Sequence, residues 1–78
     1  MITPEQVQDY IEKGMQCSQV RVLGDGEHFE ALIVSEAFRG KSRVQRHQLV
    51  YAALGERMRG EIHALSMRTL TPEEAASG

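Results

Sequence analysis

Along the chain, the spacing of the hydrophobic residues changes from that of a helix to that of strands and back again. Residues 3–15 predict a helix because apolar side chains recur three or four positions apart. These side chains are Val7, Tyr10, Ile11 and Met15. Thr3 is suited to the N-cap, Pro4 to the first helical position, and Gln6 to the third residue of a capping box. The start of this helix is therefore marked both by its cap and by its apolar stripe.

Two short segments then alternate between apolar and polar residues, which is typical of β-strands. Residues 19–23 read QVRVL, and residues 28–35 read HFEALIVS. The Gly-Asp-Gly sequence at 24–26 favours a tight turn, since Gly and Asp tolerate positive φ angles. We expect a β-hairpin in which His28 follows the turn directly. Its buried face is expected to carry Val20, Val22, Phe29, Ala31 and Ile33.

A second helix is expected after a loop at residues 36–41. Ser42 and Gln45 supply another capping box, and Gly60 is suited to the position just after the last helical turn. The apolar face of this helix is expected to carry Val44, His47, Tyr51, Leu54 and Met58.

Residues 62–69 predict a third strand, and Thr71 with Pro72 begins a short final helix that frays from Ala75 onward. The order α-β-β-α-β-α makes residues 1–78 a single small α+β domain. Its three-stranded mixed sheet is expected to carry the helices packed on one face. The second and third strands enclose a helix, so we expect them to be parallel, with a right-handed crossover. Their first residues then share one edge of the sheet.

Two histidines are expected at that shared edge. His28 opens the second strand and His63 opens the third, and adjacent strands lie about 4.8 Å apart. The two imidazoles are therefore able to converge on one ligand. The simpler interpretations are an exposed hairpin histidine at position 28 and a strand-end histidine at position 63 that bonds a nearby loop.

The composition limits the classes of function. A chain of 78 residues allows one domain, and a domain of this size buries only about 60% of its unfolded surface. Such a thin core leaves little room for a deep active site. No Ser-His-Asp order, paired acids, phosphate loop or dinucleotide motif can be assembled. We therefore expect a binding protein and not an enzyme.

The expected location follows from further features of the sequence. Cys17 is the single cysteine, so an intramolecular disulfide is excluded, and its thiol is expected to be buried and inert. No apolar run reaches membrane-spanning length, and the opening MITPEQ lacks the pattern of a signal peptide. These features favour the reducing cytoplasm, with no membrane association.

A basic loop lies at the start of the second helix, on a chain whose formal net charge is −2. Free N–H groups at a helix start favour anions, so this loop is a candidate for gripping phosphates. A solvated basic loop, or a surface for an acidic or glutathione-bearing partner, explains the same residues. The candidate nucleic-acid-binding residues are Arg39, Gly40, Lys41, Ser42, Arg43 and Arg46.

Several segments together resemble the BolA-like family in their order and spacing. They are Phe38, Gly40, the run Arg-His-Gln-Leu-Val-Tyr at 46–51, Ile-His-Ala at 62–64 and the Thr71-Pro72 pair. The resemblance covers nearly the whole chain, and the hairpin at 24–29 is similar to that of the short, acid-stress-associated bacterial branch. It implies a fold similar to a type II KH domain. His47, on the apolar face of the second helix, is expected to be a core histidine that bonds a backbone carbonyl, and thus a signature of the fold and not a ligand.

The resemblance also implies a function. Members of the family bind monothiol glutaredoxins and share a [2Fe-2S] cluster with them, and the glutaredoxin supplies a cysteine and a bound glutathione thiol. Here His63 would be the principal ligand and His28 the second, which places the chain in the histidine subgroup. The protein would then be a non-enzymatic adaptor in iron-sulfur trafficking or in iron or redox sensing. Alone it is expected to be a monomer without metal.

Two other functions stay open. Some bacterial members are described as DNA-binding transcription regulators, which would use the KH-like basic loop and helix. A partner-binding module without any metal is the third possibility. One departure from the family concerns the tail, which reads TPEEAASG and lacks the aromatic residue that usually follows Thr-Pro. The last helix is therefore expected to be short or weakly docked.

Overall fold

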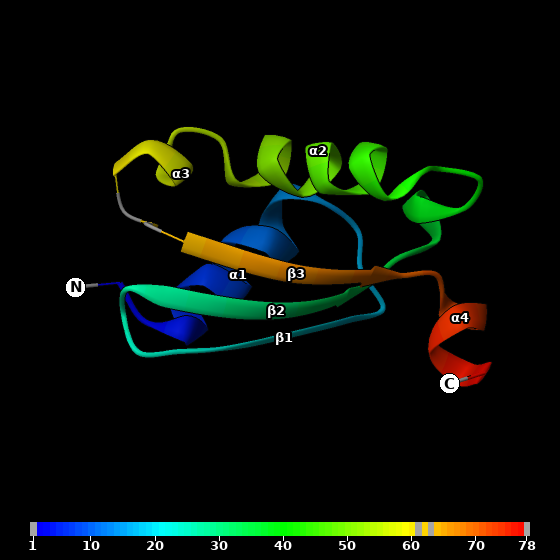
Figure 1. Cartoon of the computed structure of the whole chain (residues 1–78), viewed down its shortest axis with the longest axis horizontal. Helices are drawn as coiled ribbons and strands as arrows, with labels where there is room; N and C mark the ends of the chain where they lie inside the picture. Colours follow the sequence, from blue (N-terminus) through cyan, green and yellow to red (C-terminus); the bar gives the residue numbers. More distant parts are fainter. Residues whose placement is uncertain (1, 61, 63, 78) are drawn as a thin grey trace.

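The computed structural model of the protein describes residues 2–60, 62 and 64–77, and it has the expected α+β architecture (Figure 1). Its elements along the chain are α1 (Pro4–Gly14), β1 (Gln19–Gly24), β2 (His28–Val34), the 3-10 turn η1 (Glu36–Phe38), α2 (Arg43–Leu54), α3 (Arg57–Gly60), β3 (Ala64–Leu70) and α4 (Pro72–Ser77). The predicted order α-β-β-α-β-α is confirmed, with η1 and α3 added. None of the helices in the described part of the chain has the length and apolar character needed to span a bilayer.

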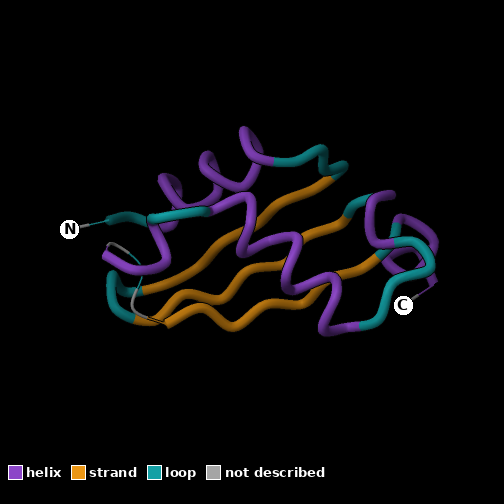
Figure 2. The backbone as a smooth tube through the Cα atoms, turned by 90° about the horizontal axis from the view of Figure 1, so that it is seen from above, coloured by secondary structure: helices purple, strands orange, loops and turns teal. Residues whose placement is uncertain are grey.

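The sheet has the strand order β1-β2-β3, with β1 antiparallel and β3 parallel to β2. Both pairings agree with the sequence prediction. Helices α1 and α2 lie against the same side of the sheet, and α2 is the crossover between β2 and β3 (Figures 1 and 2). The core between these layers contains Val7, Ile11, Val22, Phe29, Ala31, Ile33, Phe38, Val50, Leu54 and Ile62.

The hairpin between β1 and β2 forms as expected, and one carboxylate organises its turn. Asp25 Oδ1 accepts hydrogen bonds from the backbone N–H groups of Glu27 at 3.0 Å and His28 at 2.9 Å. Gly26 adopts a φ of 99°, which a residue without a Cβ reaches at little cost. The register pairs Val22 with Ala31, so the inward-facing residues of the two strands are adjacent, as the alternation predicted.

Helix α2 differs from the prediction in two ways. It ends at Leu54 and not near Gly60, because Gly55 takes a φ of 60° and turns the chain into the separate α3. Its buried face is centred on Val50 and Leu54, whereas Val44 is 66% and Tyr51 42% exposed. The expected apolar face was therefore wrong at these two positions, since β3 and α1 contact the other side of the helix.

The remaining boundaries also differ in detail. The loop expected at 36–41 contains the 3-10 turn η1, whose N-cap Ser35 accepts a hydrogen bond from the backbone N–H of Ala37. Strand β3 begins at Ala64 and ends at Leu70. The final helix continues to Ser77 and does not fray from Ala75.

The close approach of α1 to α2 depends on a glycine at the end of α1. A Cβ atom added to Gly14 would lie 2.6 Å from the carbonyl oxygen and 2.7 Å from the Cβ of Ala53 in α2. The oxygen belongs to the backbone of a packed helix and cannot move aside alone. Gly14 therefore sets the distance between the two helices that cover the sheet.

We predict that Gly14→Ala destabilises the fold by about 1–2 kcal/mol. Overpacking costs roughly 1–3 kcal/mol, and the better helix propensity of Ala returns only about 0.5–1 kcal/mol. Urea unfolding followed by circular dichroism measures the change. Gly60→Ala is the matched control, because a Cβ there meets nothing within 4 Å. Equal stabilities of the two variants would contradict this account of the helix contact.

Candidate functional site

The edge of the sheet where β2 and β3 begin carries the first predicted site. His28 is the first residue of β2, its side chain is exposed, and it pairs in register with Ala64, the first residue of β3. His63 precedes Ala64 in the sequence and lies outside the described residues, so convergence of the two imidazoles stays a prediction. The shared edge itself is established by the parallel register.

The turn beside His28 is held by a carboxylate that is already engaged. The backbone N–H groups of His28 and Glu27 lower the pKa of Asp25 below its usual value. Asp25 therefore stays ionised and fixes the start of β2. Among the described residues, no group of three His, Cys, Asp or Glu side chains is arranged to hold a metal ion. One exposed imidazole at this edge is an incomplete ligand set, which fits a metal group only when a partner supplies further ligands.

The basic loop between η1 and α2 is the second predicted site, and two of its arginines are bound to carboxylates of the same chain. Arg39 forms hydrogen-bonded ion pairs with Glu36, at 2.7 and 2.8 Å, and with Glu73 of α4. Both acids, Glu36 first, raise the pKa of Arg39 above its already high ordinary value. The charge of this arginine is therefore largely compensated within the molecule.

Arg46 is more deeply engaged than Arg39, because only 13% of its side chain is exposed. Its guanidinium donates to the carbonyl oxygens of Lys41 and Thr69, at 3.0 Å each, and to both carboxylate oxygens of Glu74, at 2.7 and 3.3 Å. It thus joins the start of α2 to the end of β3 and to α4. This network indicates a structural role for Arg46 and leaves little of it available to a ligand.

The other members of the loop are more open. Lys41 and Arg43 are exposed and form no ion pair with any described residue. Gly40 has a φ of 75° and lies in open space. Ser42 caps α2 as predicted, accepting from the backbone N–H of Gln45 at 3.2 Å. The basic surface that remains for an anion is therefore centred on Lys41 and Arg43.

The two predicted sites lie at opposite ends of the sheet. Strand β2 runs from His28 to Val34, and η1 and the basic loop follow its far end (Figure 1). Six residue steps of about 3.3 Å separate the ends of the strand by roughly 20 Å. The His28 edge and the basic loop are therefore two separate surfaces.

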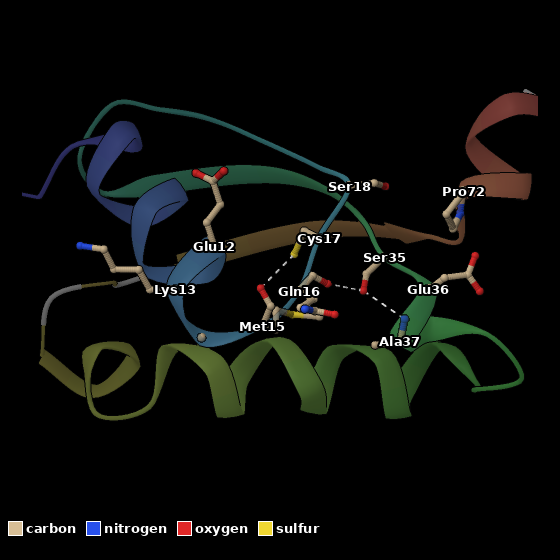
Figure 3. A pocket seen from close by; sticks show the side chains of 11 residues that line it. Glu12, Lys13, Met15, Gln16, Cys17, Ser18, Ser35, Glu36, Ala37 and Pro72 are labelled. Carbon is tan, nitrogen blue, oxygen red and sulfur yellow. Dashed lines mark hydrogen bonds between the residues drawn. The ribbon is translucent and has the colours of Figure 1, made fainter.

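A shallow groove near the end of α1 contains the single cysteine (Figure 3). Cys17 is half-buried, and burial, assisted by the negative charge of Glu12, raises the pKa of its thiol. Ser35 borders the same groove and donates to the carbonyl oxygen of Gln16 at 2.6 Å. The thiol is therefore protonated at neutral pH, which favours the inert role expected from the sequence, although Cys17 is half-buried and not fully buried as expected.

His47 was expected to lie in the core and to bond a backbone carbonyl. It is half-buried on α2, one turn before Val50, and the hydrogen bonds of the described residues include none from its ring. The expected carbonyl partner is thus absent among those residues. The acids that bind the basic loop were not predicted, and the Thr-x-x-Glu spacing of Thr71 and Glu74 was the one sequence signal that pointed to Glu74.

Comparison with known protein families gives a match over most of the chain. The family model described as BolA-like protein matches residues 5–74. The chain is 39% identical over 72 residues to the acid stress protein IbaG of Escherichia coli (strain K12), covering 91% of this chain and 86% of IbaG. It is 45% identical over 51 residues to the DNA-binding transcriptional regulator BolA of Haemophilus influenzae, covering 65% of this chain and 50% of that protein.

A solved structure shares the fold over the full length. The bolA protein homologue from Coxiella burnetii superposes with a TM-score of 0.86 at 44% sequence identity. The match covers 97% of this chain and 99% of that one. The predicted small α+β domain with a mixed three-stranded sheet is thereby confirmed.

The network around Glu74 makes a prediction about acid stability. Arg46, and after it the backbone N–H of Thr71, lowers the pKa of Glu74 to about 2 from the ordinary 4.5. A carboxyl with a lowered pKa stabilises the fold at higher pH, and that contribution is lost as pH falls from about 4.5 to 2. Glu74→Gln keeps the hydrogen-bonding geometry of the helix cap but removes the charge. We expect it to lower stability at pH 7 and to approach the parent protein near pH 2.

Denaturant midpoints measured between pH 2 and 7 test this expectation. Glu5→Gln is the matched control, since Glu5 is also in the first turn of a capped helix and is exposed. A constant difference in midpoint between Glu74→Gln and the parent protein across the whole pH range would contradict the prediction. It would mean that the loss of stability at acid pH does not come from Glu74.

Proposed function

This chain belongs to the BolA-like protein family, and on that premise we propose that it is a non-enzymatic adaptor for a monothiol glutaredoxin. The two proteins would share a [2Fe-2S] cluster, with His63 as the principal ligand from this chain and His28 as the second. The remaining ligands would be the cysteine of the glutaredoxin and its bound glutathione. The role would be iron-sulfur trafficking or sensing in the cytoplasm.

The observation that carries the proposal is the pairing of His28 with Ala64 at the start of two parallel strands. Ala64 is bonded directly to His63 in the sequence, so the register supports a common site for the two histidines. His28 is exposed at that edge and therefore accessible to a partner. The two histidines alone would form an incomplete ligand set. A metal group shared between two proteins leaves each of them with such an incomplete set.

Imidazole is suited to this task. When bound, the cluster supplies the iron chemistry, and histidine in place of cysteine raises its reduction potential. The chain's own contribution would be to present imidazole nitrogens at the sheet edge where β2 and β3 begin. The hydrogen bonds of Asp25 to the backbone of Glu27 and His28 hold that edge in place. Isolated protein would lack metal, because two ligands do not complete a tetrahedral site.

We predict that His63→Ala abolishes the visible circular dichroism of the hetero-complex cluster, and that His28→Ala weakens or alters it. The complex is reconstituted anaerobically with a monothiol glutaredoxin and glutathione, and its spectrum is compared with that of the glutaredoxin alone. Loss of a ligand changes the electronic transitions of the cluster, whereas the far-ultraviolet spectrum of the fold stays unchanged.

His47→Gln is the control for this experiment, because it removes an imidazole from α2 and leaves the sheet edge intact. Its complex should keep the parent spectrum. An unaltered cluster spectrum in His63→Ala would end the proposal that this chain provides a ligand through that residue.

DNA binding is a second candidate, favoured by the name of the Haemophilus influenzae relative and by the exposed cations of the basic loop. Lys41 and Arg43 would contact phosphates beside the start of α2, where backbone N–H groups also favour anions. Because this loop is roughly 20 Å from the His28 edge, the two functions do not compete for one surface. The formal net charge of −2 limits non-specific attraction to DNA.

For this candidate we predict that the double variant Lys41→Gln, Arg43→Gln weakens binding to a DNA duplex. Two lost phosphate contacts should reduce the slope of log K against log salt by about 2. Fluorescence anisotropy at several salt concentrations gives that slope. Lys13→Gln is the control, since this exposed lysine lies on α1. Equal slopes for the double variant and the control would contradict the proposal that Lys41 and Arg43 contact DNA phosphates.

A further inference from the structure

One face of the sheet is left open by the helices from His28 to Leu32, whereas Val34, farther along β2 on the same face, is buried. The core consists of side chains from the other face, where Phe29, Ala31 and Ile33 pack against α1 and α2. Alternate residues of a strand point to opposite faces. His28, Glu30 and Leu32, which alternate with those core residues, therefore lie on the open face. Figure 1 shows this side of the strands in front of α1.

The register places residues of all three strands in rows across this face. One row consists of Arg21, Leu32 and Arg68, because Arg21 pairs with Leu32 and Leu32 pairs with Arg68. Both arginines are exposed, and the leucine between them is half-buried. The two cationic side chains are thus carried two strand spacings apart, roughly 10 Å, on either side of an apolar centre.

The next row toward the hairpin turn adds one apolar side chain beside two polar ones. It consists of Leu23, Glu30 and Ser66, and Leu23 is 63% exposed, which is high for a leucine in a regular strand. The row after that begins with His28 and Ala64. The open face therefore continues from the two arginines, past Leu32, Leu23 and Glu30, to the proposed ligand His28.

The charges of this face are not used inside the molecule. Neither Arg21 nor Arg68 forms an ion pair with a described residue. By contrast, Arg39 after η1 and Arg46 on α2 are both bound to acids. Glu30 is the acidic member of the same face and lies diagonally between the two arginines. The face therefore offers two guanidinium groups that form no ion pair with a described residue, on either side of Leu32 and near the exposed Leu23.

We propose that this open face, defined by Arg21, Leu23, Glu30, Leu32 and Arg68, is the docking surface for the partner that shares the His28 site. The partner surface it fits has an apolar centre with carboxylates on two sides, about 10 Å apart. This inference rests on the proposed function, because it takes the glutaredoxin as the occupant. Its new content is the face on which that partner sits.

Two physical arguments favour this occupant. His28 lies on the open face, so a protein that shares a ligand group with it approaches from that side of the sheet. Complementary charge around an apolar centre then determines the orientation of the complex and speeds association. The apolar centre gains from burial of Leu23, which in the isolated chain exposes most of its side chain to water.

The test is the affinity of this protein for a monothiol glutaredoxin, measured by isothermal titration with and without cluster. The double variant Arg21→Glu, Arg68→Glu reverses both charges of the face, and we expect its complex to be at least about tenfold weaker. The matched control is Lys13→Glu, Arg59→Glu, which makes the same change in net charge at two exposed cations of α1 and α3. Its affinity should stay within about twofold of the parent value.

The outcomes separate the two proposals. Equal affinity of both double variants and the parent protein would overturn the docking face and leave the adaptor function standing. Equal weakening of both variants would also overturn it, as an effect of net charge alone. Absence of any complex with the parent protein would remove the adaptor function and this surface together. A change of oligomeric state in Arg21→Glu, Arg68→Glu, seen by analytical ultracentrifugation, would assign the face to a second copy of the chain.

Discussion

The parallel pairing of β2 with β3 is the constraint on which the rest of this structure depends. Parallel strands cannot be joined by a tight turn, so α2 must cross over the sheet between them. That crossover covers one face, and α1 joins it there, which leaves most of the other face, as far as Leu32 on β2, to solvent. The same pairing brings the first residues of β2 and β3 to one edge. Architecture, open face and histidine edge are thus three consequences of one register.

With so small a core, the ends of the elements are held by polar contacts. Helix α4 buries none of its side chains, and it is retained by the capping box of Thr71 with Glu74 and by ion pairs to Arg39 and Arg46. Arg46 is mostly shielded from water, so its pairing with Glu74 is the stronger attachment, whereas the exposed pairs contribute little. Part of the basic loop therefore serves the fold, and its capacity for anions is smaller than its composition suggests.

The elements that local chemistry determines were predictable from the sequence. The caps at Thr3 and Ser42, the alternation in the strands and the turn around Asp25 all formed as expected. The face of α2 was not predictable, because Val44 and Val50 look alike in sequence and only the positions of α1 and β3 decide which one is buried. The break at Gly55 was also missed, since a glycine inside a helical pattern is compatible with either outcome.

The sites show the same division between local and long-range information. The shared edge of His28 and β3 followed from topology alone, whereas the pairing of Arg39 with Glu73 joins residues that are distant in sequence and depends on where α4 docks. Side-chain direction in a strand has a period of two, so a slip of one residue in β2 would turn His28 and Leu32 toward the helices and Phe29 into water. Burial of Phe29 at 1% exposure rules out that slip. The packing of the core therefore determines which face carries the histidine, and with it the side from which a partner can reach it.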